Sequence, residues 1–258
     1  GLGIPAEPLF RSRTLCLARQ SRSFIIGETN FMSFIELLQS MGKIFVEYWD
    51  IFLIKGLGIT LLLSIITVAF GSLIGALFAM AKISRLCVLK FIVSVIVEII
   101  RGTPILLQLY VAYFLIPMLF PALKLSDFAC IAIALVLNSA AYVSEIIRSG
   151  IEAVDKGQTE ASRSLGLSAS VTMIHIVLPQ AIKNILPALG NEFITVIKET
   201  SLASTFFVGE LMTSYLIVKG NTFSSLPTLM IVGVIYFVLT FILSKILKVF
   251  ERRMKSHA

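Results

Sequence analysis

Charged side chains are scarce in this 258-residue chain, where Asp, Glu, Lys and Arg make up 14% of the residues and hydrophobic residues 57%. Soluble domains carry about 25% charged residues. A fold surrounded by water could not hide this much apolar side chain, whereas a lipid bilayer could. The net charge of +7 does not indicate nucleic acid as a partner, because the basic residues stand between and after the apolar runs and form no continuous basic face. The composition predicts an integral membrane protein.

Motifs for catalysis and metal binding are also missing. Cys16, Cys87 and Cys130 form no CxxC or Cys/His pair, so we expect neither a metal site nor a disulfide framework. Neither HExxH nor GxSxG occurs, and His175 and His257 are isolated, which disfavours a membrane enzyme. No Walker A pattern GxxxxGK[ST] is present. The chain is therefore not expected to hydrolyse ATP or to bind a cofactor itself.

The first 31 residues differ in composition from the rest of the chain. Arginines stand among serines there, with Glu7 and Glu28 as the only acids. A transit peptide is one interpretation, but no apolar h-region of a secretory signal is present. We favour a disordered or non-native extension over residues 1–31, with Met32 as the natural start. Residues 32–50 would then form an N-terminal amphipathic segment.

Long apolar runs predict about five transmembrane helices, since a spanning helix needs about 20 mostly apolar residues. The runs are Gly56–Ala81, Leu86–Phe120, Asp127–Ile147, Ile185–Ile217 and Gly220–Ser244. The second run is interrupted by Glu98, Arg101 and Pro104 and is too long for one straight span. We expect a long tilted or broken helix there, ended by Pro117 and Pro121.

Lysine and arginine placement predicts the orientation, because cytoplasmic loops are enriched in these residues. If the first span starts outside, the inner segments hold Lys82, Arg85, Lys90, Arg148, Lys156, Arg163, Lys183, Lys245, Lys248, Arg252, Arg253 and Lys255. The outer loops then hold only Lys124 and Lys219, with Lys43 and Lys55 before the first span. We therefore expect both the polar loop, residues 148–183, and the C-terminus in the cytoplasm.

Within that loop, the segment Glu160–Pro179 has the form of a docking surface. Its pattern predicts a helix, a glycine break, a second short helix and a proline stop. Ala161 and Ser162 are small and let a partner approach closely. Gly166 permits a sharp change of direction, and Pro179 is not expected to continue the helix. A rigid knob of this kind suits contact with another protein.

This segment resembles the EAA loop of permeases of ATP-binding-cassette (ABC) importers, E-A-A-x3-G-x9-I-x-L-P, with Ser162 in place of the second alanine. Residues 101–110, 141–148, 190–193 and 198–202 resemble segments of permeases for polar amino acids of the histidine, glutamine and arginine type. The resemblance implies an all-α, MetI-like permease domain over residues 51–253, followed by a tail, 254–258. It also assigns ATPase coupling to Glu160, Ala161, Ser162, Gly166, Leu178 and Pro179.

The resemblance further implies a permease subunit that carries a polar amino acid across the bacterial cytoplasmic membrane by alternating access. The implied partners are a pair of ABC ATPase subunits that bind ATP and Mg²⁺, a second permease chain (identical or different), an extracytoplasmic solute-binding protein or domain, and membrane lipid. An importer for another small polar solute remains an alternative. An ion-coupled secondary transporter is a second alternative, although no internal inverted repeat is visible.

Polar residues inside the apolar runs are candidates for the translocation pathway, because ionisable groups in a bilayer are costly and usually face a cavity or a partner. An amino acid presents an ammonium and a carboxylate, so its site needs both acceptors and donors. The candidates are Arg101, Gln108, Asn138, Glu145, Glu192, Lys198, Glu199, Thr200 and Ser201. Alternatively, most of these charges form structural ion pairs or lie at the membrane interface. Lys198 and Glu199 are adjacent and cannot share one helix face.

Overall fold

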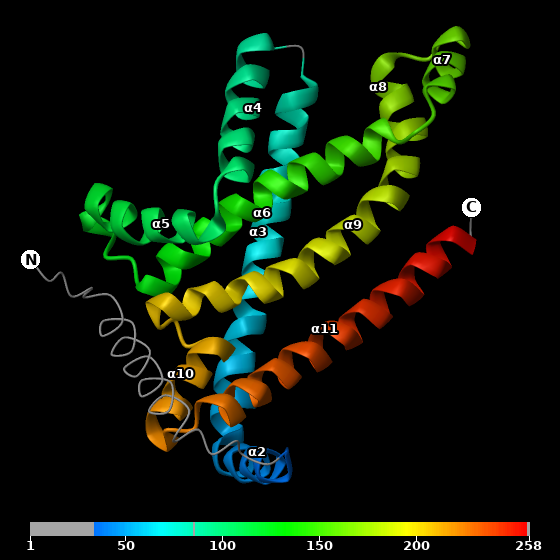
Figure 1. Ribbon diagram of the computed structural model, residues 1–258. Coiled ribbons are helices and arrows are strands. Elements are labelled where there is room, and N and C mark those ends of the chain that lie inside the picture. The colour runs from blue at the N-terminus through cyan, green and yellow to red at the C-terminus, as the bar shows by residue number, and fades with distance from the viewer. Residues whose placement is uncertain (1–33, 85, 257–258) are drawn as a thin grey trace, which may run out of the picture.

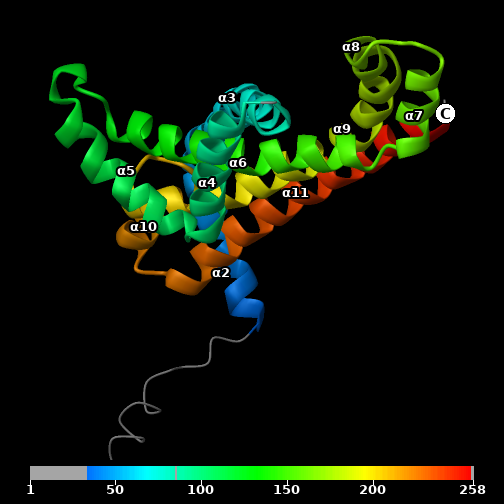
Figure 2. The same ribbon diagram turned by 90° about the horizontal axis from the view of Figure 1, so that it is seen from above.

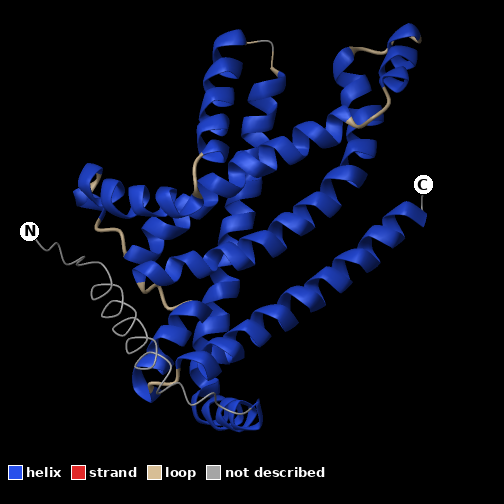
Figure 3. Ribbon diagram, in the orientation of Figure 1, coloured by secondary structure: helices blue, strands red, loops and turns tan. Residues whose placement is uncertain are grey.

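The computed structural model describes residues 34–84 and 86–256, and the regular elements in these ranges are helical (Figure 1, Figure 3). The expected extension, residues 1–31, lies outside the described residues. In the described part of the chain, four helices are long and apolar enough to cross a membrane, or five spans if a bent helix pair counts as one. The prediction of an all-α membrane protein with about five spans is confirmed.

The first span belongs to a helical run from Phe34 to Ile83. This run consists of α2 (Phe34–Trp49), the π-helical segment η1 (Asp50–Gly56) and α3 (Leu57–Ile83). The backbone of Tyr48 departs from helical geometry, with φ −119° and ψ 21°. The run therefore kinks there, and Figure 1 shows α2 almost end-on at the base of the upright α3. From Phe34 onward, the predicted amphipathic segment corresponds to α2.

Two glycines of α3 allow close packing against α6 (Asp127–Glu152). A Cβ added to Gly71 would lie 2.9 Å from the side chain of Ser139, and one added to Gly75 would lie 2.7 Å from Val143. Carbon atoms in favourable contact are about 3.5–4.0 Å apart. Neither position could carry a side chain without moving α6, so the small residues at this spacing set the distance between the two helices.

The second apolar region is a broken helix, one of the two forms expected for it. It consists of α4 (Cys87–Gly102) and α5 (Ile105–Leu119), which meet at 110°. Thr103 is extended, with φ −114° and ψ 146°, because Pro104 disfavours helical geometry in the residue before it. The prediction that Pro117 ends the helix is wrong, since Pro117 lies inside α5. Pro121 then opens the short helical turn η2 (Pro121–Leu123).

The predicted span Ile185–Ile217 is also wrong in its bounds. The helix begins earlier and is interrupted, giving α9 (Leu178–Glu199), the 3-10 turn η4 (Thr200–Phe206) and α10 (Leu211–Thr222). Phe207 and Gly209 have φ of 51° and 86°, which no continuing right-handed helix permits. The last helix, α11 (Ser225–Ser256), starts later than predicted, after a left-handed Phe223, and runs further.

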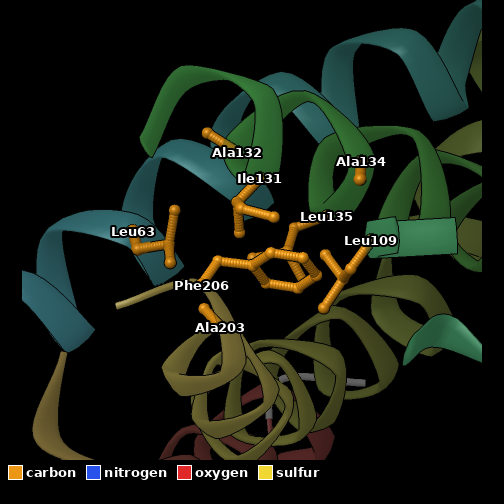
Figure 4. Close-up of a cluster of buried hydrophobic side chains, with 8 residues drawn as sticks. All are labelled: Leu63, Leu109, Ile131, Ala132, Ala134, Leu135, Ala203 and Phe206. Carbon is orange, nitrogen blue, oxygen red and sulfur yellow. The ribbon is translucent and has the colours of Figure 1, made fainter. Parts of the chain in front are cut away.

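The helices α6, α9 and α11 run side by side across the molecule in both views (Figure 1, Figure 2). A buried cluster at one end of this layer joins Ile131 and Leu135 of α6 to Leu63 of α3, Leu109 of α5 and Phe206 of η4 (Figure 4). This core fixes η4 against α3, α5 and α6. The opposite end of the same layer carries α7 and α8, described next.

Candidate functional site

The segment between α6 and α9, here called the coupling segment (residues 155–177), projects beyond the ends of both helices (Figure 1, Figure 2). It consists of α7 (Lys156–Ser164), α8 (Ala169–Thr172) and the π-helical segment η3 (Met173–Val177). Side-chain oxygens of Asp155 and Ser168 accept hydrogen bonds from the backbone N–H groups of Gly157, at 2.7 Å, and Val171, at 3.3 Å. These are N-caps, which satisfy N–H groups that have no partner within a helix. Both short helices therefore have defined starts.

Gly166 makes the turn between the two short helices. Its φ of +84° lies in the left-handed region, and no atom comes within 4 Å of where its Cβ would be. Glycine is needed here for the backbone conformation and not for space. The turn leaves Leu165 with 83% of its surface exposed, and the Arg163 guanidinium donates to the Leu167 carbonyl at 2.5 Å.

The predicted docking residues of α7 divide between two faces. Glu160 and Ala161 are exposed, as is Leu165 at the tip. Ser162 is buried, and its hydroxyl donates to the Gln158 carbonyl at 2.6 Å. Ser162 thus faces the rest of the coupling segment, whereas Glu160 and Ala161 lie on the face that is open to a partner.

The predicted proline stop is wrong. Pro179 is the second residue of α9, and α8, η3, α9 and η4 form one helical run from Ala169 to Phe206. Pro179 directly follows the π-helical segment η3, where regular α-helical hydrogen bonding is already interrupted, so the N–H group that proline lacks breaks no regular α-helical bond. Leu178 and Pro179 therefore lie inside a continuous helix. The coupling segment continues into α9 without a flexible joint.

An apolar cluster holds the coupling segment onto the membrane helices. Val154 and Val177 pack with Ala181 and Ile185 of α9, and partly buried side chains from α6 and η3 surround them. A Cβ on Gly150 of α6 would overlap Ile185, so α6 and α9 approach closely at this point. We call this contact the coupling end of α9.

Glu145 is the centre of a charge cluster that joins three helices. Its carboxylate pairs with Lys82 of α3, with Arg148 at 2.9 Å and with Arg101 of α4 at 3.6 Å. Arg101 also lies over the ring of Tyr142, 5.5 Å from its centroid. The structure thus brings the candidates Arg101 and Glu145 together within an ion cluster. Lys82, a second cation that pairs with Glu145, was not among the sequence candidates, because the loop placement gave no sign that its side chain turns inward.

Gln108 and Asn138 also meet, at the bend between α4 and α5. The Gln108 amide donates to the carbonyls of Ile100 at 2.6 Å and Thr103 at 3.0 Å, and its oxygen accepts from Asn138 at 2.9 Å. Every polar atom of the Gln108 side chain is therefore used. The pair holds the bend against α6.

The remaining candidates lie on α9 and η4, away from the coupling end. Glu192 accepts a hydrogen bond from Ser139 at 3.1 Å, while Lys198 is exposed and Glu199 half-buried. The hydroxyls of Thr200 and Ser201 donate to the carbonyls three residues earlier, at 2.7 and 2.6 Å. Within residues 34–84 and 86–256, Glu192 and Glu199 form no ion pair.

Sequence reasoning did not select Glu210, although it is a fully buried acid. Glu210 caps α10 and accepts a hydrogen bond from Tyr236 of α11 at 3.1 Å. The available signal was a lone acid after Gly209 within an apolar region. That signal does not reveal a tyrosine partner 26 residues away along the chain.

Comparisons with known proteins place this arrangement among transport proteins. Residues 68–256 match the family described as "Binding-protein-dependent transport system inner membrane component". The arginine transport system permease protein ArtQ of Bacillus subtilis is 41% identical over 206 residues, which cover 80% of this chain and 94% of the relative. The glutamine transport system permease protein GlnP of Escherichia coli K12 is 37% identical over 203 residues, or 79% and 93% of the two chains.

Solved structures agree with these relatives. A crystal structure of an amino acid ABC transporter with histidines superimposes with a TM-score of 0.77 at 43% identity, over 81% of this chain and 96% of that one. An inward-facing structure of the MetNI methionine ABC transporter gives a TM-score of 0.65 at 18% identity, over 79% and 96%. The second likeness shows the fold alone.

Proposed function

The chain belongs to the family of binding-protein-dependent transport system inner membrane components, and from this premise we propose that it is the permease subunit of an ABC importer for a polar amino acid. As a member of this family it is a multi-pass membrane protein that works together with other transporter subunits. The observation that carries the proposal is the coupling segment. It presents Glu160, Ala161 and Leu165 to a partner and runs directly into α9.

The proposed mechanism uses α9 as a lever. An ATPase subunit binds the exposed face of α7, and closure of the ATPase pair moves the coupling segment. Because α8, η3 and α9 form one helical run, this movement reaches the polar residues of α9 and η4, from Glu192 to Ser201. The site for the amino acid would then open to one side of the membrane and close to the other.

ATP and Mg²⁺ bind to the ATPase subunits in this proposal, since the permease chain has no Walker A pattern. One coupling segment serves one ATPase, so a pair of ATPases needs a second permease chain, identical or different. A solute-binding protein or domain delivers the amino acid from outside. The coupling segment and the C-terminal end of α11, which lie on the same side of the molecule (Figure 2), face the cytoplasm of a bacterium, as the placement of lysine and arginine predicts.

Reconstitution into vesicles tests the proposal. The chain is purified with candidate ATPase subunits, and uptake of labelled amino acids is measured with and without ATP, in competition with each of the twenty amino acids. We expect ATP-dependent uptake that a small set of polar amino acids inhibits. Uptake by the chain alone, without ATP or an ATPase, would contradict the proposal and favour an ion-coupled transporter.

Two variants test whether uptake and ATPase binding depend on the coupling segment. Glu160→Lys reverses the charge of the exposed face, and Gly166→Leu forces a side chain into the left-handed conformation, which costs about 1–2 kcal/mol. Uptake and retention of the ATPase should fall together in both variants. Gly220→Leu is the matched control, because Gly220 also has open space around its Cβ but is helical. It should retain both properties.

A further inference from the structure

Glu210 accepts four hydrogen bonds at the start of α10. One carboxyl oxygen accepts from the backbone N–H of Met212, at 2.6 Å, and from the hydroxyl of Tyr236, at 3.1 Å. The other oxygen accepts from the N–H and the hydroxyl of Thr213, at 2.7 and 3.0 Å. The side chain is fully buried, and in the part of the chain that the structure describes it forms no ion pair. Uncharged donors alone stabilise this acid.

Capping by itself does not require a glutamate. The starts of α6, α7 and α8 are capped by Ser126, Asp155 and Ser168, whose short side chains are the usual N-caps. Glu210 has a longer side chain and, besides capping α10, contacts Tyr236 of α11. The additional length therefore serves a contact between helices.

Thr60 of α3 extends this contact to a third helix. Its hydroxyl accepts a hydrogen bond from the backbone N–H of Leu211, at 3.0 Å. Glu210, Tyr236 and Thr60, here called the polar node, thus join α3, α10 and α11. The 3-10 turn η4 packs against two of these helices, α3 and α10.

The polar node holds the end of α9 that lies opposite the coupling segment. α9 ends at Glu199 and passes without a gap into η4, which begins at Thr200. One end of the lever is therefore next to the proposed ATPase contact. The other end continues into η4, which packs against α3 and α10, two of the helices that the polar node joins.

We infer that Glu210 and Tyr236 are positioning residues, which hold the far end of α9 in place while the coupling segment moves the near end. Without a fixed end, movement of the coupling segment would displace α9 as a whole and would not rearrange the residues between Glu192 and Ser201. This inference rests on the proposed function. It predicts that loss of the contact separates ATP hydrolysis from transport.

The variant Tyr236→Phe removes one hydroxyl and keeps the ring. Amino acid uptake and ATP hydrolysis are measured in the same vesicles with the assembled complex, and their ratio gives the amino acid transported per ATP. We expect this ratio to fall about tenfold, the size of effect that loss of a buried hydrogen bond can produce. ATP hydrolysis should stay within about twofold of the wild type, a factor that corresponds to a small free-energy change.

Tyr215→Phe is the matched control. Tyr215 is also largely buried, and its hydroxyl bonds to Ser225 at 2.9 Å, so it likewise links α10 to the start of α11. In the described residues its hydroxyl forms no hydrogen bond with Glu210, and its ratio of transport to hydrolysis should equal that of the wild type. Glu210→Gln, which keeps one acceptor oxygen, should lower the ratio as Tyr236→Phe does. It provides an independent test of the same contact if either variant assembles poorly.

The possible results separate the inference from the proposed function. If uptake and hydrolysis fall in parallel in Tyr236→Phe, or if Tyr236→Phe behaves like Tyr215→Phe, the contact is only structural and the inference is overturned. If the wild-type complex itself shows no ATP-dependent uptake, the proposed function fails and the inference fails with it. A fall in the ratio confined to Tyr236→Phe and Glu210→Gln supports the inference.

Discussion

The two ends of α9 differ in their polar contacts. At the coupling end, Val154, Val177, Ala181 and Ile185 form an apolar cluster. At the far end, η4 also lies in an apolar core, through Ala203 and Phe206, but the neighbouring polar node adds the hydrogen bond between Glu210 and Tyr236 that joins α10 to α11. Apolar contacts are not directional and can be kept while helices shift slightly, whereas hydrogen bonds weaken steeply when their angles change. These contacts allow α9 to act as a lever, whose coupling end can move while its far end keeps its direction.

The largest effect is expected from overpacking the coupling end. Gly150→Leu would place a side chain where Ile185 already lies and would push α6 away from α9. Overpacking of a core typically costs about 1–3 kcal/mol and sometimes more, and here two membrane helices would have to separate. We expect loss of the folded protein on size-exclusion chromatography in detergent. Gly233→Leu, at an open position on α11, should elute like the wild type.

A second large effect is expected at the far end. Glu210→Ala would leave buried donors of Met212, Thr213 and Tyr236 without an acceptor. Loss of a cap and unsatisfied buried donors together should lower the free energy of unfolding by about 3 kcal/mol. Thermal unfolding in detergent measures this change. An unchanged melting temperature would mean that the polar node contributes nothing to holding α9.

The corresponding change at the coupling end should be smaller. Ser168→Ala removes the cap of α8. Among the described residues, the donor that loses its partner is the Val171 N–H, at an exposed site that water can reach. We expect a loss of about 1 kcal/mol in the same unfolding measurement. If Ser168→Ala destabilised the protein as much as Glu210→Ala, the proposed difference between the two ends would be wrong.

The smallest effect should come from the outer member of the charge cluster. Glu152 pairs with Arg148 at 2.6 Å, but 61% of its side chain is exposed. Exposed pairs contribute at most about 1 kcal/mol, so Glu152→Gln should change the melting temperature very little. Glu145→Gln, at the half-buried centre where Lys82, Arg101 and Arg148 converge, should change it more.

The sequence predicted the membrane class, the helical fold and the loop between α6 and α9, because apolar runs and loop charges depend only on composition along the chain. It did not predict where α9 begins and ends. Pro179 gives the same local signal whether it ends a helix or lies inside one, and only the continuity of the helix through η3 decides between the two. The left-handed Phe207 was also unexpected, because bulky residues rarely adopt that conformation.

Sequence position was also not enough to reveal the contacts of the pathway candidates. Sequence position identified Arg101 and Glu145 as polar residues in apolar runs. It did not identify Lys82, the other cation that pairs with Glu145, because Lys82 belongs to α3 and reaches Glu145 only through the packing of α3 on α6. Tyr236 was not a candidate either, since a tyrosine in an apolar helix gives no sign of a buried hydrogen bond. Their roles in transport remain predictions.

The continuity of the coupling segment with α9 is the central claim, and one insertion tests it most directly. Two glycines placed between Val177 and Leu178 would leave the docking face intact and give α9 a flexible joint, because glycine disfavours helix. Uptake per ATP, measured in vesicles that contain the assembled complex, should fall to background while the ATPase stays bound and active. Uptake per ATP equal to that of the wild type would contradict the account, since movement would then reach the far end of α9 by another route.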